Sequence, residues 1–367
     1  MRSRVVGALL VGFGVLALVF AGGLAFVVAP QVAQLPYDMQ PTQSVAEAPN
    51  AEFLQITNGV AKINTGTLRS TIRVQPDSKA TADLEGKLDG TALVWVVGQE
   101  VVRTDTNEVV SAYSTSLAVD RKTGAAQNWD KQWLDTGNER QSVTYAGQTY
   151  KFPFGTEKKS YDMFDRDLLK AQPMQFVKTE QMGGLETYQF TQEIRDETLD
   201  FPADRLALLV GQLLPGSTSA ELKYSNTRTV WVDPTTGQYI SVQERQQKSL
   251  VAPDGKSVTL LNAVFSYTNE TVAKAADTAK SNGDKLNLVG VTVPIGLTVL
   301  GLILLVLGTL LVVRGRRQTA AAAQVPAQRK GGRHVAPADS ADADDAPTEA
   351  LPTAEAAEPE KSGSKTD

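Results

Sequence analysis

The chain contains no cysteine and only one histidine, His334, among its 367 residues. Without thiols it has no disulfide scaffold, no iron–sulfur cluster and no cysteine nucleophile. Because His334 follows the last long apolar run, the preceding chain lacks the base of a Ser-His-Asp triad and the ligands of a His-rich zinc site. We therefore expect a protein that is not an enzyme, with no cofactor, no metal and no catalytic residues.

Carboxylate chemistry is the enzymatic alternative that remains, and it needs two acids about 5 to 10 Å apart in a cleft. The densest acidic cluster is Asp162, Asp165 and Asp167. Acids near the start of a helix are usually caps and partners of the helix dipole. We interpret these three in that way.

The chain also lacks an excess of positive charge. Its formal net charge is −5, and residues 38–285 contain 32 acidic and 26 basic side chains. Such a surface has no general attraction for nucleic acid or for anionic headgroups. We expect no nucleic-acid partner.

Two long runs without charge organise the chain, Val5–Ala29 and Leu286–Val313. About 20 apolar residues suffice to cross a bilayer as a helix. Basic residues precede the first run and follow the second, and the positive-inside rule therefore places both termini in the cytoplasm. The prediction is a two-pass plasma-membrane protein with a cytoplasmic N-terminus (1–4), spans at 5–29 and 286–313, an extracytoplasmic domain (30–285) and a cytoplasmic tail (314–367).

A cleaved signal peptide is the alternative for the first run, but the apolar core of such a peptide is usually 7–15 residues. This run is longer and ends just before Pro30, a poor neighbour for cleavage, which favours an uncleaved anchor. Its alanines from Ala17 to Ala29 recur every four positions and predict a ridge that receives Thr292 and Gly296 of the second span. The general abundance of alanine in membrane helices explains the pattern equally well.

Residues 30–285 have the composition of a β-rich domain. Pro30–Pro49 is rich in Pro, Gln and Ala, which is typical of a tether or an irregular entry segment. From Phe53 onward, β-branched and aromatic runs bounded by Gly, Asn and Asp predict strands. These runs are Leu68–Val74, Ala92–Val97, Glu108–Val119, Thr227–Val232, Tyr239–Glu244 and Thr259–Tyr267. The predicted fold class is membrane-anchored α+β, mainly β, with antiparallel strands and covering helices.

Turn residues predict two hairpins in this domain. Gln175–Ile194 turns at Gly183-Gly184, residues that accept positive φ, and Gln141–Phe154 turns at Ala146-Gly147. Helices are predicted at Ser78–Leu88, capped by Asp77 or Ser78, and at Tyr161–Ala171, ended by Pro173. Thr271–Asp284 is expected to lead as a helix or loop into the second span.

The most apolar helix predicted outside the membrane is Asp204–Leu214. Leu206, Leu209, Val210 and Leu213 fall at helical spacing, and Pro215-Gly216 ends the segment. One interpretation is a helix that simply covers a face of the sheet. The other is a lid over a hydrophobic cavity, which makes these four residues our candidate ligand-facing positions.

Two stretches of the chain resemble each other. Ser116–Gly124 and Thr229–Gly237 each form a strand that ends in Val-Asp, followed by two residues and Thr-Gly. The Asp side chain caps a type I turn, and Gly takes the left-handed position that follows it. We therefore interpret Asp120 and Asp233 as turn formers. A domain of two related β-units is the architecture we favour, and independent origin of the two turns is the alternative.

The motifs Tyr161-Asp-Met-Phe-Asp, Pro173-Met-Gln-Phe-Val, Gly184-Leu-Glu-Thr-Tyr-Gln-Phe and Tyr224-Ser-Asn-Thr-Arg-Thr-Val-Trp-Val-Asp-Pro-Thr-Thr-Gly237 carry a resemblance. Together with the two-anchor layout, these motifs resemble the actinobacterial porin PorA family, which was long carried as a domain of unknown function. The resemblance extends from Val5 to Val313. The resemblance brings no catalytic or ligand residues. The family name implies a pore, whereas a membrane β-barrel needs many strands of about ten residues with a lipid-facing apolar stripe. The predicted strands are mostly shorter, so a pore requires oligomerisation of the spans.

The hypothesis we favour is a non-enzymatic cell-envelope protein whose extracytoplasmic domain binds a hydrophobic or lipid ligand. One alternative is a scaffold whose partner is another envelope component, recognised by an exposed aromatic patch around Trp129 and Trp133. The other is an oligomeric pore. Gln318–Asp367 has almost no large apolar residue, and we expect it to be disordered.

Overall fold

The computed structural model describes residues 2–137 and 140–322. They belong to a compact unit that ends at Gly315 and to a unit that begins at Arg316, of which only the last turns of one helix are described. Most of the tail predicted to be disordered, including His334, therefore lies outside the described residues. The arrangement below is that of the first unit.

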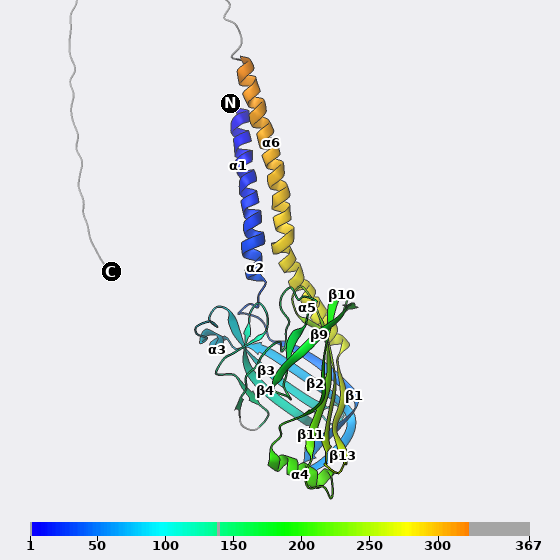
Figure 1. Cartoon of the computed structure of the whole chain (residues 1–367). Coiled ribbons are helices and arrows are strands. Elements are labelled where there is room, and N and C mark those ends of the chain that lie inside the picture. The colour runs from blue at the N-terminus through cyan, green and yellow to red at the C-terminus, as the bar shows by residue number, and fades with distance from the viewer. Residues whose placement is uncertain (1, 138–139, 323–367) are drawn as a thin grey trace, which may run out of the picture. The chain divides into compact units, whose positions relative to one another are not determined.

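Two helical segments are long and apolar enough to cross a membrane (Figure 1). The first comprises α1 (Arg2–Gly23), the π-helical η1 (Leu24–Val28) and α2 (Ala29–Val32). The second comprises α5 (Asn269–Asn287), the π-helical η2 (Leu288–Thr292) and α6 (Val293–Ala322). Both predicted spans are confirmed as helices, and the second continues without a break from the β domain.

Small residues at every seventh position bring the two segments together. Gly7 and Gly14 of the first are buried against Gly308 and Gly301 of the second, and Ala21 and Pro294, seven residues further along each helix, are also buried. A Cβ built on Gly14 would lie 2.8 Å from the carbonyl oxygen of Gly301, and one on Gly308 would lie 2.7 Å from that of Gly7. The helices therefore pack antiparallel, backbone against backbone.

The predicted ridge of alanines at every fourth position is only partly right. Ala21 is buried, and a Cβ built on Gly290 would lie 3.3 Å from that of Ala29, but Thr292 and Gly296 are exposed and a Cβ on Gly296 would meet nothing within 4 Å. A four-residue spacing drifts around the helix, whereas a seven-residue spacing keeps a seam facing a nearly antiparallel partner. The contact between the two helices, called the glycine seam below, is therefore formed by Gly7, Gly14, Gly301 and Gly308.

The β domain consists of long antiparallel strands. These are β1 (Thr42–Thr57), β2 (Val60–Pro76), β3 (Ala92–Arg103), β4 (Val109–Asp120), β9 (Lys170–Met182), β10 (Leu185–Thr198), β11 (Glu221–Val232), β12 (Tyr239–Val251) and β13 (Ser257–Tyr267). They run from 11 to 17 residues, so the prediction of mostly shorter strands was wrong. Thr42–Pro49, predicted as part of a tether, belongs to β1.

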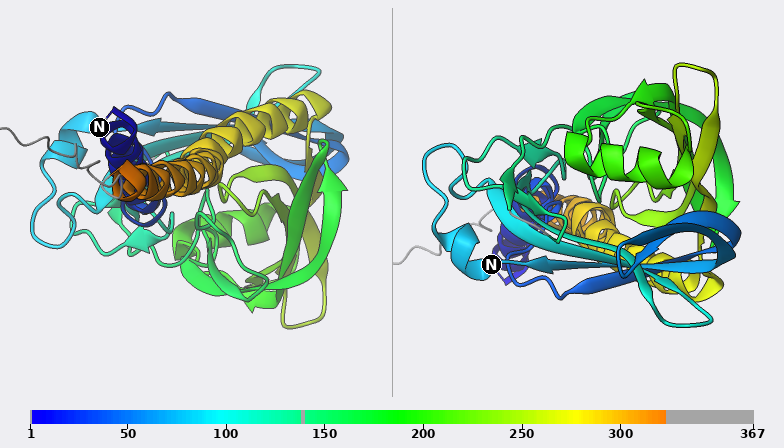
Figure 2. Two further views of the ribbon diagram at one scale, coloured as in Figure 1. Left: turned by 90° about the horizontal axis from the view of Figure 1, so that it is seen from above. Right: turned by 90° about the horizontal axis from the view of Figure 1, so that it is seen from below.

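One sheet contains these strands and the short β5 (Ala126–Gln127), β6 (Trp133–Asp135), β7 (Gln141–Ser142) and β8 (Tyr161–Asp165), in the order β7-β6-β4-β3-β2-β1-β13-β12-β11-β10-β9-β8. Gln148 links the β4–β5 part of the sheet to its far edge, because it bridges Ala125 beside β5 and Met163 of β8. The Gln148 amide donates to the Asp162 carbonyl at 2.7 Å, and the Phe164 amide donates to the Gln148 carbonyl at 2.8 Å. The sheet is thereby closed into a barrel, seen from its two ends in Figure 2.

Two local predictions in this closing region were wrong. Tyr161–Ala171 is the β8–β9 hairpin and not a helix, and only Gln141–Ser142 of the predicted hairpin at 141–154 is a strand. Met163 and Phe164 are adjacent, and each is buried in a different apolar cluster. A strand that lies between two clusters buries both of its faces, and periodicity alone does not distinguish it from a buried helix.

Three further helices pack against the barrel. Asp77 caps α3 (Ser78–Ala82) by accepting from the amide of Ala80, and this helix is shorter than predicted. The predicted apolar helix is confirmed as α4 (Ala203–Leu213) and lies at the end of the barrel away from α1 and α6 (Figure 1). The helix α5 packs through Ala276 and Ala279 on Ile240 of β12.

The outward face of the strands is polar. Arg69 of β2 pairs with Glu47 of β1, and Arg195 of β10, 81% exposed, pairs with Glu193. Lipid-facing strands carry an apolar band instead. The polarity of this face, and not the length of the strands, therefore distinguishes the domain from a membrane barrel.

The helix seam gives a direct prediction. Gly14→Leu forces a side chain against the Gly301 backbone, which has no room to move, and overpacking of this kind costs about 1–3 kcal/mol. We expect a lower thermal unfolding midpoint of the full chain in nanodiscs. Gly12→Leu, at an exposed position with nothing within 4 Å, is the control and should leave the midpoint unchanged. Equal effects of the two substitutions would contradict the seam.

Candidate functional site

The turn between β8 and β9 begins with a buried carboxylate. Asp165 at the end of β8 has a side chain only 1% exposed, and it accepts from the backbone amides of Asp167 and Leu168 at 3.0 Å each. Leu169 completes the turn with a φ of 53°, a conformation that a leucine adopts rarely. The carboxylate thus organises its own turn and faces the opposite wall.

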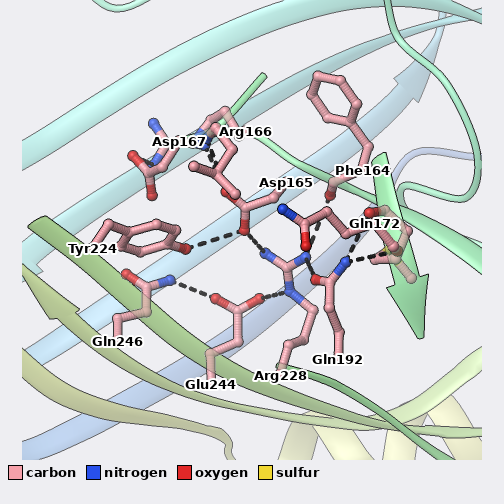
Figure 3. Close-up of polar contacts among 12 residues, drawn as sticks. Phe164, Asp165, Arg166, Asp167, Gln172, Gln192, Tyr224, Arg228, Glu244 and Gln246 are labelled. Carbon is pink, nitrogen blue, oxygen red and sulfur yellow. Dashed lines mark hydrogen bonds and ion pairs between the residues drawn. The ribbon is translucent and has the colours of Figure 1, made fainter. Parts of the chain in front are cut away.

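Asp165 is bound by side chains of that wall (Figure 3). The Tyr224 hydroxyl donates to it at 3.1 Å, and the Arg228 guanidinium lies 3.3 Å away. Arg228 also pairs with Glu244 and donates to the Gln192 side chain at 3.0 Å. One arginine of β11 therefore joins the turn, β10 and β12.

A second set of charges extends the network. Lys248 of β12 pairs with Asp167 at 2.8 Å, and Arg166 lies 3.3 Å from the same carboxylate. The Arg166 guanidinium stacks over the Tyr113 ring, 4.4 Å from its centroid. With Asp165, Glu244 and Arg228, the network contains three acids and three bases. Its formal charges balance.

The network shifts the pKa values of two of its members, Asp167 and Tyr224, in opposite directions. Burial opposes the charged form of Asp167, but the charges of Arg166 and Lys248 outweigh burial, and the pKa of Asp167 lies well below its usual range. Burial, followed by the nearby charges of Asp167 and Asp165, raises the pKa of Tyr224. At neutral pH Asp167 is therefore ionised and Tyr224 keeps its proton.

The two repeated turns lie on either side of the segment that closes the barrel. Asp120 accepts from the backbone amides of Lys122 and Thr123, and Asp233 accepts from that of Thr236 at 2.7 Å. Gly124 and Gly237 have φ of 68° and 71°. The interpretation of both aspartates as turn formers is confirmed.

Lys151 lies between these two turns, 8% exposed. Its ammonium donates to the carbonyls of Phe152 at 2.7 Å and of Thr236 at 2.5 Å, and lies 3.7 Å from the centre of the Phe154 ring. Burial lowers the pKa of Lys151 to about 7, although the charge of Asp233 opposes the shift. This lysine thus titrates near neutral pH.

The candidate ligand-facing residues lie where α4 meets the end of the barrel. Leu209 and Val210 are each 3% exposed, within a cluster that includes Leu222 of β11 and Leu250 of β12. Leu206 and Leu213 are half-buried and pack against the same cluster. The structure thus brings all four residues to one apolar cluster.

The acidic cluster seen in the sequence divides. Asp162 is exposed, whereas Asp165 and Asp167 belong to the buried network, not to a helix start. Sequence reasoning missed Arg228, Glu244 and Lys248, although β12 gives a signal: Gln243–Lys248 is polar at every position, so polar side chains must face inward as well as outward. In the described part of the chain, no group of three His, Asp or Glu side chains forms a metal site.

Trp129 and Trp133, proposed above as marks of a partner surface, are both partly covered. Trp129 packs against a cluster that contains Leu84 and Val94. The Arg140 guanidinium stacks on the Trp133 ring, 4.1 Å from its centroid. The geometry therefore gives these tryptophans local packing partners.

The chain is similar to known proteins along most of its length. The family model of Porin PorA matches residues 6–310. The chain belongs to the Porin PorA family. Porin PorA of Corynebacterium resistens is 25% identical over 406 aligned positions, which cover 86% of this chain and 98% of the relative. Porin PorA of Corynebacterium amycolatum is 24% identical over 284 positions, which cover 63% of this chain and 73% of the relative.

The ion network predicts that removal of the Asp165 carboxylate lowers the free energy of unfolding strongly, and that removal of the nearby Asp162 carboxylate does not. Asp165→Ala leaves Arg228 without one of its two acidic partners and the turn without its cap, and breaking a buried pair costs about 3–5 kcal/mol. Denaturant unfolding of the full chain measures the loss. Asp162→Ala, at an exposed position, should cost less than about 0.5 kcal/mol. A similar cost at both positions would contradict the network.

Lys151 predicts a pH dependence of stability. Between pH 7 and 9 the folded state has lost this proton, whereas the unfolded chain holds it up to about pH 10.5. Stability therefore rises with pH over this window, by about 2 kcal/mol for a shift of this size. Unfolding curves at pH 7 and 9 should show this gain in the wild type and not in Lys151→Met. A gain that persists in Lys151→Met would assign the effect to other groups.

Proposed function

We propose that the protein is a two-span membrane protein of the cell envelope that holds an apolar or amphiphilic ligand beneath α4. In this proposal both termini are cytoplasmic and the barrel is extracytoplasmic. The basic residues Arg314 and Arg316 at the far end of the second span support this orientation. The polar outward face of the barrel supports a domain surrounded by water.

The observation that carries the proposal is the apolar cluster under α4. In the sequence this helix lies between β10 and β11, which pair with each other in the sheet. Its apolar face closes one end of the barrel. The strands provide the rest of the cluster: Leu54, Ala61, Ile63, Leu222, Leu250, Val258 and Leu260. A barrel end lined by aliphatic side chains is suited to an acyl chain.

The attachment of α4 supports a lid that opens. Its tie to the β1–β2 turn is the Gln212 side chain, which accepts from the Ala61 amide at 2.7 Å and donates to the Gly59 carbonyl at 2.9 Å. The connection to β11 begins at Pro215-Gly216, and Gly216 has a φ of 86°. A short helix between two linkers can move without breaking strand pairing.

A pore is the second candidate, favoured by the names of the relatives. The glycine seam leaves no room for water between the two helices of one chain, so conduction needs several helix pairs. A groove between the helices, lined by Phe13, Phe20, Leu297 and Leu304 among others, offers an apolar surface for assembly. Conductance of the purified chain in planar bilayers tests this candidate directly.

The lid proposal predicts a bound mass. Native mass spectrometry of the full chain, extracted from host membranes in polymer-bounded discs, should detect a ligand that organic solvent removes. Leu206→Gln with Leu213→Gln should abolish the added mass, because the two amides face the apolar cluster. Leu208→Gln, on the exposed side of α4, is the matched control and should retain the mass.

Two outcomes would overturn the lid proposal. One is a wild-type chain that has no added mass. The other is a ligand that remains bound to the Leu206/Leu213 variant, which would locate it away from α4. Conductance steps with a bare chain mass would favour the pore.

A further inference from the structure

Asn226 of β11 has an amide that nothing in the described residues satisfies. The residue is 1% exposed, and neither its Oδ1 nor its Nδ2 has a hydrogen-bond partner in the described part of the chain. A buried amide without a partner loses its hydration and gains nothing in return. Buried polar groups in native proteins are nearly always hydrogen-bonded. The unpaired Asn226 amide therefore indicates a hydrogen-bonding partner that is not part of the described chain.

Strand geometry directs this amide into the barrel. Asn226 alternates along β11 with Tyr224 and Arg228, which contact Asp165 in the interior. Side chains two residues apart on a strand share a face. The Asn226 amide therefore points inward, like its two neighbours.

The position of Asn226 is a boundary between two environments. On one side, toward α4, Leu222 and Leu250 belong to the apolar cluster. On the other side, Arg228 and Glu244 belong to the charge-balanced network. Its cross-strand neighbours are the aliphatic Ile194 and Gln246, whose amide nitrogen donates to Glu244.

We propose that Asn226 binds the uncharged, hydroxyl-bearing head group of an amphiphile whose apolar chain lies beneath α4. This proposal rests on the proposed function. A carboxamide offers one acceptor and two N–H donors, which match a hydroxyl group that donates and accepts. A charged head group is disfavoured, because the network beside it has three acids and three bases already paired.

The test compares two probes that share one acyl chain. The full chain in nanodiscs is titrated with 1-oleoylglycerol, which has an uncharged diol head, and with oleate, which has a carboxylate. Wild type should bind 1-oleoylglycerol at least about tenfold more tightly, a difference worth about 1.4 kcal/mol. Asn226→Leu, nearly the same shape, should remove this preference. Asn262→Leu, at an exposed position on β13, is the control and should keep it.

The thermal unfolding midpoint of the unliganded protein separates a binding role from a structural one. If the amide serves binding, Asn226→Leu leaves the midpoint unchanged or raises it, because an unpaired polar group is removed. A preference that survives in Asn226→Leu, with a lowered midpoint, would overturn the proposal and assign the amide to ordered structural water. Should that variant fail to fold, Asn226→Ala is measured in the same way.

The two proposals fail differently. If wild type binds neither probe and has no native ligand, the lid function and the Asn226 subsite are both overturned. If wild type binds both probes equally and Asn226→Leu changes nothing, the subsite alone is overturned and the apolar site beneath α4 stands.

Discussion

The ion pair between Asp165 and Arg228 is the contact on which the barrel depends. Asp165 belongs to the turn that enters the interior, and Arg228 belongs to the wall that the turn meets. Charges in such a place are stable only as a paired set, because each unpaired one would face a medium of low polarity. Pairing therefore holds the turn against β11 and β12.

The two ends of the barrel pack against different helices. At one end α4 closes an apolar cluster, and at the other α5 packs on β12 and continues into α6. The continuous helix ties the position of the barrel to that of the second span. The glycine seam then fixes the first span against the second. Although the family is named for pores, the barrel of this chain has polar side chains on its outward face and is attached to two long apolar helices.

The sequence predicted the parts of this structure whose signals are local. The two spans, the Gly183-Gly184 hairpin, α4 and the turns at Asp120 and Asp233 were all found from spacing and turn chemistry. The β8–β9 hairpin was mistaken for a helix, because Met163 and Phe164 are both apolar and serve two different clusters. The ion network could not be derived, since its partners come from strands far apart in the sequence and polar residues on β12 resemble a solvated face.

The side of the membrane on which the barrel lies is the most direct test of this account. The natural absence of cysteine allows a single cysteine to be placed at Arg195 on the outer face of β10, or in the C-terminal tail, and labelled with a membrane-impermeant maleimide on spheroplasts. We predict that Arg195→Cys reacts on intact spheroplasts and that the tail cysteine reacts only after permeabilisation. Protection of Arg195→Cys until permeabilisation would contradict an extracytoplasmic, water-exposed barrel.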